Sequence, residues 1–129
     1  MRIVALALVL ALAACEPPPE RRQLTGTFSY AFELNHFEEV GRPNTDWCLT
    51  DDSVAALGLG RRARWMVAVD LTADVEISAP GRYGHMGTCT REVRITRLIE
   101  QRGPYCPLSA DACARIEEIE RQEAVERGN

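Results

Sequence analysis

The sequence contains no lysine, no excess of positive charge and no long apolar run. All 15 basic residues are arginines, which we attribute mainly to GC-rich coding, and the formal net charge is -4. A chain of this charge has no basic field that would attract nucleic acid, so no nucleic-acid partner is expected. Arginine favours bidentate contacts with carboxylates, so the surface acids are expected to be paired. A length of 129 residues fits one domain with one core.

Three familiar site motifs are also missing. The chain has no C-x-x-C pair, from which zinc sites usually draw their ligands. In the glycine-rich stretch PGRYGHMG, residues 80–87, the last glycine is followed by Thr88 and not by the lysine of a phosphate-binding loop. The spacing of its glycines, and the strand expected after it, do not match a dinucleotide-binding fingerprint. We therefore expect no cofactor and no metal.

The N-terminus carries a short apolar run, residues 3–12, after Arg2. It is too short to span a bilayer as a helix, and it ends in Leu-Ala-Ala-Cys at Cys15. This closure resembles the bacterial lipobox. The resemblance implies that residues 1–14 are a signal peptide and that Cys15 is the lipid attachment site, anchored in the bilayer by its acyl chains. An ordinary signal peptide with a chance cysteine is the alternative.

The residues after Cys15 indicate a location and a domain layout. Glu16 stands where aspartate would retain a lipoprotein in the inner membrane, which favours the outer membrane, facing the periplasm. Residues 15–23 contain three consecutive prolines and are predicted to form an extended tether. The remaining chain is expected to form a β domain over residues 24–108 and a helix over residues 109–129.

Four cysteines remain for the fold once Cys15 is assigned to the anchor. An even number of cysteines in an exported chain predicts disulfides. The sequence allows three connectivities. We favour Cys48–Cys89 together with Cys106–Cys113, because the second pair would close a short loop at the start of the helix. A zinc site built from these cysteines is the alternative.

Alternating apolar and polar residues predict the strands. The strongest signal is the run 65–78, in which every second residue from Trp65 to Ile77 is apolar. This run is about twice a typical strand length, so it forms either one long bent strand or two strands that share a bend near residues 72–74. Shorter strands are expected at residues 24–34, 46–50 and 89–100.

Two segments have helical signals. Residues 51–60 are expected to form one helical turn that is capped by Asp52 or Ser53 and ended by glycines. The tail is expected to form a helix capped by Ser109, with one narrow apolar stripe and two i,i+4 ion pairs. The stripe consists of Ala112, Ile116 and Ile119. The expected ion pairs are Glu117–Arg121 and Glu123–Arg127.

The elements together predict a mainly β fold. A long, bent, amphipathic strand closes small barrels of the oligonucleotide/oligosaccharide-binding (OB) type. We therefore expect a small OB-like β-barrel or a strongly curved antiparallel sheet, with a C-terminal helix. A β-sandwich is the alternative, although it usually needs about seven strands.

Several stretches resemble a family of short, uncharacterised bacterial lipoproteins. They are YAFELNHF, the tryptophan strand DWCLT, and PGRYGHMGTCTREVRITRLIE. Most of the likeness lies in residues 80–87 and the Arg-Glu-Val that follows at 91–93. The resemblance implies an exported lipoprotein with a compact β domain, and it supplies no catalytic residue.

The stretch PGRYGHMG has two competing interpretations. The first makes it a connection between strands, with a type II turn at Pro80-Gly81 and positive φ angles at the later glycines. Tyr83 would then cover the open end of the barrel, while Arg82 pairs with a surface carboxylate. The second makes Arg82, Tyr83 and His85 the mouth of a binding groove for a sugar ring or a peptidoglycan carboxylate.

Catalysis has weak support in the sequence. His85 has no evident nucleophile beside it, because Cys89 is expected to be oxidised. The acids next to His36 are interpreted as a solvated turn, so no catalytic constellation is recognisable. We therefore predict a non-catalytic, membrane-anchored envelope module that binds a protein or a glycan, or that has a structural role in support of another complex. The alternative is a small periplasmic hydrolase or metal-handling protein that uses His85 and His36, which would have to meet a carboxylate in one pocket.

Overall fold

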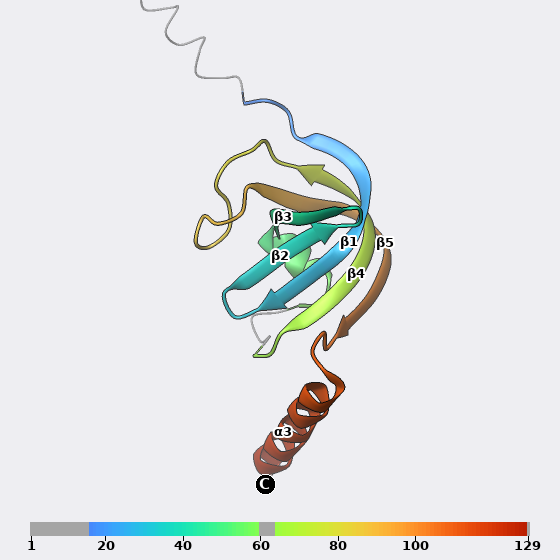
Figure 1. Cartoon of the computed structure of the whole chain (residues 1–129), viewed down its shortest axis with the longest axis vertical. Helices are drawn as coiled ribbons and strands as arrows, with labels where there is room; N and C mark the ends of the chain where they lie inside the picture. Colours follow the sequence, from blue (N-terminus) through green and yellow to red (C-terminus); the bar gives the residue numbers. More distant parts are fainter. Residues whose placement is uncertain (1–15, 60–63, 129) are drawn as a thin grey trace, which may run out of the picture.

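The computed structural model describes residues 16–59 and 64–128 (Figure 1). The signal peptide predicted for residues 1–14 and the lipidation predicted at Cys15 lie outside the described residues. Within these described residues, five strands, one short helix and one long helix follow one another. They are β1 (Glu20–Ala31), β2 (Leu34–Glu39), β3 (Arg42–Leu49), α2 (Asp51–Ala56), β4 (Val67–Ile77), β5 (Arg91–Tyr105) and α3 (Ala110–Gly128).

The five strands close into a ring in the order β1-β2-β3-β5-β4, with β4 returning to β1. Each neighbouring pair is antiparallel except β3 and β5, which pair in parallel at Trp47–Leu49 and Arg91–Val93. A ring with an odd number of strands cannot alternate direction all the way round, so one parallel pair is unavoidable. The prediction of a mainly β, barrel-like fold with a C-terminal helix is confirmed, and the sheet is mixed.

β4 is one continuous strand, as the first of the two sequence interpretations predicted. Its inward residues are buried at alternate positions: Val69, Leu71, Ala73, Val75 and Ile77. The register between β4 and β5 shifts near Thr72/Ala73 and again near Asp74/Val75, where the bend was expected. At both shifts the extra residue belongs to β5, Ile99 at the first and Thr96 at the second, so β5 is the bulged strand and bends where it pairs with β4.

β1 differs from its prediction at both ends. It begins at Glu20, inside the predicted tether, because Glu20 to Gln23 pair with the far end of β4. The strand expected over residues 24–34 is interrupted by a turn in which Glu33 has a φ of 62°. Phe32 was expected on the buried face, and it is 84% exposed at the tip of this turn. The faces predicted from the alternating pattern are therefore correct within the strand and wrong in the turn.

Helix α2 closes one side of the core, and its cap differs from the prediction. Thr50 caps the helix, since its side chain accepts a hydrogen bond from the Ser53 amide. The hydroxyl of Ser53 is buried and accepts a bond of 2.8 Å from the Ile95 amide, which anchors α2 to β5. Gly58, with a φ of 78°, follows the helix end as expected. Leu57 joins the core cluster.

Helix α3 extends away from the barrel beyond the end of β5 (Figure 1). Ser109 caps it as predicted, accepting a hydrogen bond of 3.3 Å from the Ala112 amide. No residue of α3 is buried. The predicted ion pair of Arg127 with Glu123 is present at 3.9 Å, whereas Arg121 pairs with Glu118 in place of Glu117. Within the described ranges, no helix is long and apolar enough to cross a membrane.

Candidate functional site

Both predicted disulfides are present. Cys48–Cys89 joins β3 to the loop between β4 and β5, with a Cα–Cα distance of 5.7 Å. Cys106–Cys113 joins the chain after β5 to the first turns of α3, with a Cα–Cα distance of 5.9 Å. Disulfides persist in oxidising surroundings, so the pairing indicates an extracytoplasmic compartment.

The loop that contains PGRYGHMG folds back on itself above the Cys48–Cys89 disulfide. The backbones of Tyr83 and Cys89 exchange two hydrogen bonds, of 2.9 and 3.1 Å. Between them, Gly84 and Gly87 have φ angles of 79° and 63°, so the prediction of positive φ angles at these glycines is confirmed. This backbone pairing, together with the disulfide, gives the loop a defined shape.

Three other predictions for this loop are wrong. Gly81 is not among the glycines with positive φ, so the type II turn expected at Pro80-Gly81 does not form. The hydroxyl of Tyr83 donates a bond of 2.7 Å to the Ala79 carbonyl, and its ring packs over Gly81. Tyr83 therefore packs within its own loop and does not cover the end of the barrel. Arg82 is exposed and makes no ion pair within residues 16–59 and 64–128.

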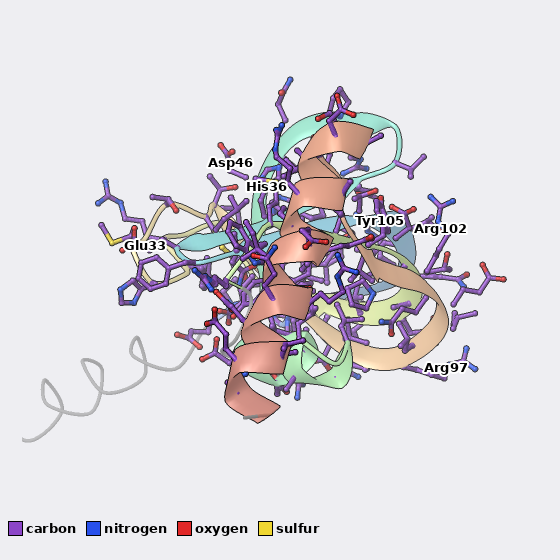
Figure 2. The ribbon with its side chains drawn as sticks, turned by 90° about the horizontal axis from the view of Figure 1, so that it is seen from below. Glu33, His36, Asp46, Arg97, Arg102 and Tyr105 are labelled. Atoms are coloured by element: carbon purple, nitrogen blue, oxygen red, sulfur yellow. A yellow bond between two sulfur atoms is a disulfide. The ribbon has the colours of Figure 1, made fainter. Side chains whose placement is uncertain are left out.

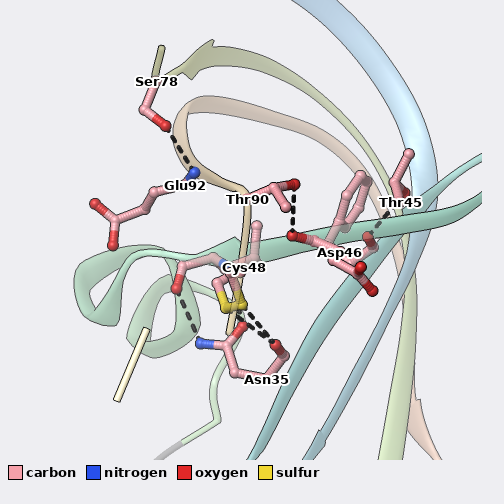
Figure 3. Close-up of a disulfide and its surroundings, with 10 residues drawn as sticks. Asn35, Thr45, Asp46, Cys48, Ser78, Thr90 and Glu92 are labelled. Atoms are coloured by element: carbon pink, nitrogen blue, oxygen red, sulfur yellow. Dashed lines mark hydrogen bonds between the residues drawn. A yellow bond between two sulfur atoms is a disulfide. The ribbon is translucent and has the colours of Figure 1, made fainter. Parts of the chain in front are cut away.

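Asn35 bridges β2 and β3 beside the disulfide (Figure 3). Its side-chain amide donates to the Leu49 carbonyl and its side-chain oxygen accepts from the Leu49 amide, both at 2.9 Å. Its own carbonyl oxygen lies 3.2 Å from Sγ of Cys48. The backbone pairing of β2 with β3 is found further along, at Phe37↔Trp47. The Asn35 side chain thus replaces a pair of backbone hydrogen bonds between β2 and β3 where the two strands diverge.

An open groove of about 970 Å³ lies at this end of the barrel. One wall is the turn between β1 and β2, and the other is the loop around Gly84 to Met86; the end of β3 and the start of α2 complete it. His85 lines the groove, whereas Arg82 and Tyr83 are not among its lining residues. Of the three residues predicted for a binding loop, the structure therefore brings only His85 to the groove.

The charged residues along the groove are all acidic or histidine. Glu33, Asp46, Asp51 and Glu92 line it, and no arginine does so among the described residues. None of the four carboxylates forms an ion pair with any residue the structure describes. In Figure 2, Glu33, His36 and Asp46 lie on one side of the molecule, away from the labelled Arg97 and Arg102 on the other. The groove is therefore a zone of uncompensated negative charge.

The two histidines line the same groove, although they do not form a recognisable catalytic or metal site. His36 Nε2 is 4.0 Å from the carboxylate of Glu38, which is not among the residues that line the groove. No group of three His, Cys, Asp or Glu side chains in the described parts of the chain could hold a metal ion. The sulfur atoms of the groove belong to the disulfide or to Met86, so no described thiol is free to act as a nucleophile there.

The opposite face of the barrel carries paired charges. Arg22 donates to Glu39, with one bond of 2.9 Å, and these hydrogen bonds lower the pKa of the Glu39 carboxyl. Asp70 accepts bonds from Arg102, from the Thr27 hydroxyl at 2.8 Å and from Tyr105 at 3.0 Å. The bond from Arg102 is the main cause of a lowered pKa at Asp70. The expectation of arginine–carboxylate pairs is confirmed on this face.

A smaller hollow of about 440 Å³ lies among these paired charges. Glu76 lines it and forms ion pairs with Arg94 and, at 3.1 Å, with Arg21. Hydrogen bonding from Arg94 lowers the pKa of the Glu76 carboxyl. Because its charges already have partners within the barrel, this hollow is a weaker candidate for a binding site than the groove.

The sequence did not indicate the acidic residues of the groove. Glu33 lies in a turn where the sequence predicts a strand, Asp46 at the edge of a predicted strand, and Glu92 within another. These residues are far apart in the chain, so no local spacing could mark them. For the groove as a whole, the available signal was the glycine-rich stretch, which places His85 and Met86 side by side.

Comparisons of the chain with protein-family models, with curated proteins and with solved structures found no match. The resemblance to bacterial lipoproteins therefore stays a prediction from the sequence. The candidate site is interpreted from its own geometry: a groove at one end of a barrel, with a disulfide behind it and unpaired carboxylates along it.

Proposed function

We propose that this protein is a membrane-anchored bacterial envelope lipoprotein whose barrel is a non-catalytic binding module. The groove between the β1–β2 turn and the loop around His85 is its binding site. The observation that carries the proposal is this open groove of about 970 Å³, built on a disulfide-linked barrel. Binding sites are typically concave and largely preformed, with a few polar groups among apolar ones.

The anchor has independent support in the N-terminal sequence. Leu-Ala-Ala-Cys closes the apolar run, and only residues 16–19 separate Cys15 from β1. Several acyl chains on Cys15 would hold the domain at a bilayer, with the outer membrane favoured by Glu16 and the domain in the periplasm. The two disulfides fit this oxidising location. The groove would then face an envelope protein or a glycan.

The anchor is tested by changing Cys15 to alanine. The full-length chain should incorporate labelled palmitate and fractionate with the outer membrane, and Cys15→Ala should lose both properties. A matched variant, Cys106→Ala/Cys113→Ala, removes cysteines elsewhere and should keep the label. Unchanged labelling and fractionation of Cys15→Ala would contradict the anchor.

The groove is tested by cross-linking in intact cells. A photoreactive residue at position 86 lies at the groove, and one at position 40 lies at the exposed turn between β2 and β3. Discrete adducts from position 86, and none from position 40, are expected. Equal patterns from both positions, or none from either, would contradict a binding role for the groove.

The alternative is a small periplasmic hydrolase or metal-handling protein. The observation in its favour is that His36 and His85 line one groove. Calorimetric titration with Zn²⁺ of the full chain and of His36→Ala/His85→Ala separates the two functions. Stoichiometric, histidine-dependent zinc binding would favour the alternative over the non-catalytic module.

A further inference from the structure

Two large apolar side chains stand in solvent on facing walls of the groove. Phe32, at the tip of the β1–β2 turn, is 84% exposed, and Met86, in the opposite loop, is 70% exposed. The two residues are more than 50 positions apart in the chain, and they line one groove only because of the fold. Exposed apolar groups that gather around a concavity mark interaction sites more often than scattered ones do.

The negative charge along the groove favours a ligand of positive charge. Glu33, Asp46, Asp51 and Glu92 have no ion-pair partner among the residues described, although acids on the outer face of the barrel are paired with arginine. Like charges across an interface cost several kcal/mol, and opposite charges steer association. An anionic ligand, such as the peptidoglycan carboxylate considered from the sequence, is therefore disfavoured, and a cationic ligand is favoured.

The exposed apolar side chains and the unpaired carboxylates together limit the chemical class of the ligand. A polyamine has the charge but no apolar side chain, and a neutral sugar has neither. An extended polypeptide presents side chains at intervals of about 3.3 Å on alternate sides, so it can offer apolar and cationic groups to one groove. His36 adds a polar side chain to the same lining. Methionine also adapts its shape to varied apolar partners.

We propose that the groove binds an extended polypeptide segment that carries arginine or lysine beside an apolar side chain. Phe32 and Met86 contact the apolar side chain from the two walls, and the carboxylates of Glu33 and Asp46 contact the cationic one. This inference rests on the proposed function, because it identifies the occupant of the same groove. It commits the binding module to a protein partner and not to a glycan.

Three fluorescent peptides of equal length test the proposal, with alternating leucine and arginine, leucine and glutamate, or leucine and glutamine. Fluorescence anisotropy with the purified full-length chain measures the dissociation constant of each. The arginine peptide should bind, and the glutamate peptide should bind at least about tenfold more weakly. Affinity for the arginine peptide should fall as salt is added, since exposed charges are screened.

Two double variants test whether the carboxylates and the apolar side chains of the groove are needed for peptide binding. Each variant has a matched control. Glu33→Gln/Asp46→Asn should weaken binding of the arginine peptide about tenfold, whereas Glu100→Gln/Glu126→Gln, with the same change in net charge, should not. Phe32→Ser/Met86→Ser should weaken it similarly, whereas Val40→Ser, at an exposed turn elsewhere, should not. All these side chains are exposed, so thermal melting should stay unchanged.

The outcomes separate this inference from the proposed function. Equal losses in the groove and control charge variants would show attraction by net charge alone and would overturn the proposal. Retained binding in Phe32→Ser/Met86→Ser, or effective competition by spermine, would overturn the proposed contact of these two residues with an apolar side chain of the ligand. Adducts from position 86 in cells, combined with no binding of the arginine peptide, would reject the cationic polypeptide while leaving the groove as a binding site.

Discussion

A Cβ atom on Gly84 would lie 2.9 Å from Sγ of Cys48, well inside van der Waals contact. Gly84 also has a φ of 79°, a left-handed conformation that side chains with a Cβ adopt only at a cost. The loop wall of the groove therefore approaches the disulfide more closely than any other residue type would allow. The position of His85 and Met86 depends on this one close approach.

Replacing Gly84 with valine should lower the free energy of unfolding by about 1–3 kcal/mol. Both the backbone angle and the contact with Cys48 oppose the new side chain. Arg82→Ala/His85→Ala, in the same loop, should change it by no more than about 0.5 kcal/mol. Urea denaturation measures both. A harmless Gly84→Val, or an equal loss in both variants, would contradict this account of the loop.

Replacing Asn35 with leucine should cost about 2–4 kcal/mol, because the buried amide and carbonyl of Leu49 would both lose their partners. Asn35→Asp retains an acceptor for the Leu49 amide but loses the donor. At low pH its protonated carboxyl can donate again, so this variant should regain stability relative to the unchanged protein. Denaturation at two pH values checks this, and a leucine variant of full stability would contradict it.

The two disulfides should differ in their effect on the barrel. Cys48–Cys89 closes a segment with a sequence separation of 41, so Cys48→Ser/Cys89→Ser should cost about 3–4 kcal/mol. Cys106→Ser/Cys113→Ser should leave barrel unfolding within about 0.5 kcal/mol, because no residue of α3 is buried. Tryptophan fluorescence follows the barrel, and circular dichroism follows α3. Alkylation without reductant should label none of the four thiols.

Acid should destabilise the barrel through Glu39 and Asp70. Hydrogen bonds from Arg22 and Arg102 lower the pKa of these carboxyls from ordinary values of 4.5 and 3.8. A carboxyl with a lowered pKa in the folded state contributes stability above its ordinary pKa, and this is lost as the pH falls through the folded value.

Denaturation midpoints measured from pH 6 down to pH 2 should therefore fall below about pH 4.5. Glu39→Gln/Asp70→Asn should be less stable at neutral pH and should show a shallower fall. The control Glu126→Gln removes a charge from α3 and should keep the original slope. A double variant with an unchanged slope would contradict the role of these two pairs.

Several features could be read from short stretches because their physical causes are local. Alternation over residues 65–78 predicted β4, since side chains alternate across any strand. The Ser109 cap and the positive φ angles at Gly84 and Gly87 also follow from the chemistry of a few neighbouring residues. The alternation failed at Phe32, where a turn ends the strand while the pattern of residue types continues.

The sequence by itself determined which segments alternate, that four cysteines were available for pairing, and that arginine would serve as the partner of surface acids. Only the tertiary structure decided that the ring has one parallel pair and that the Asn35 side chain replaces a backbone rung. It also decided that Phe32 and Met86 line one groove together with unpaired carboxylates. Such contacts join residues from distant segments, and their energies depend on ring closure, which no local pattern of residue types records.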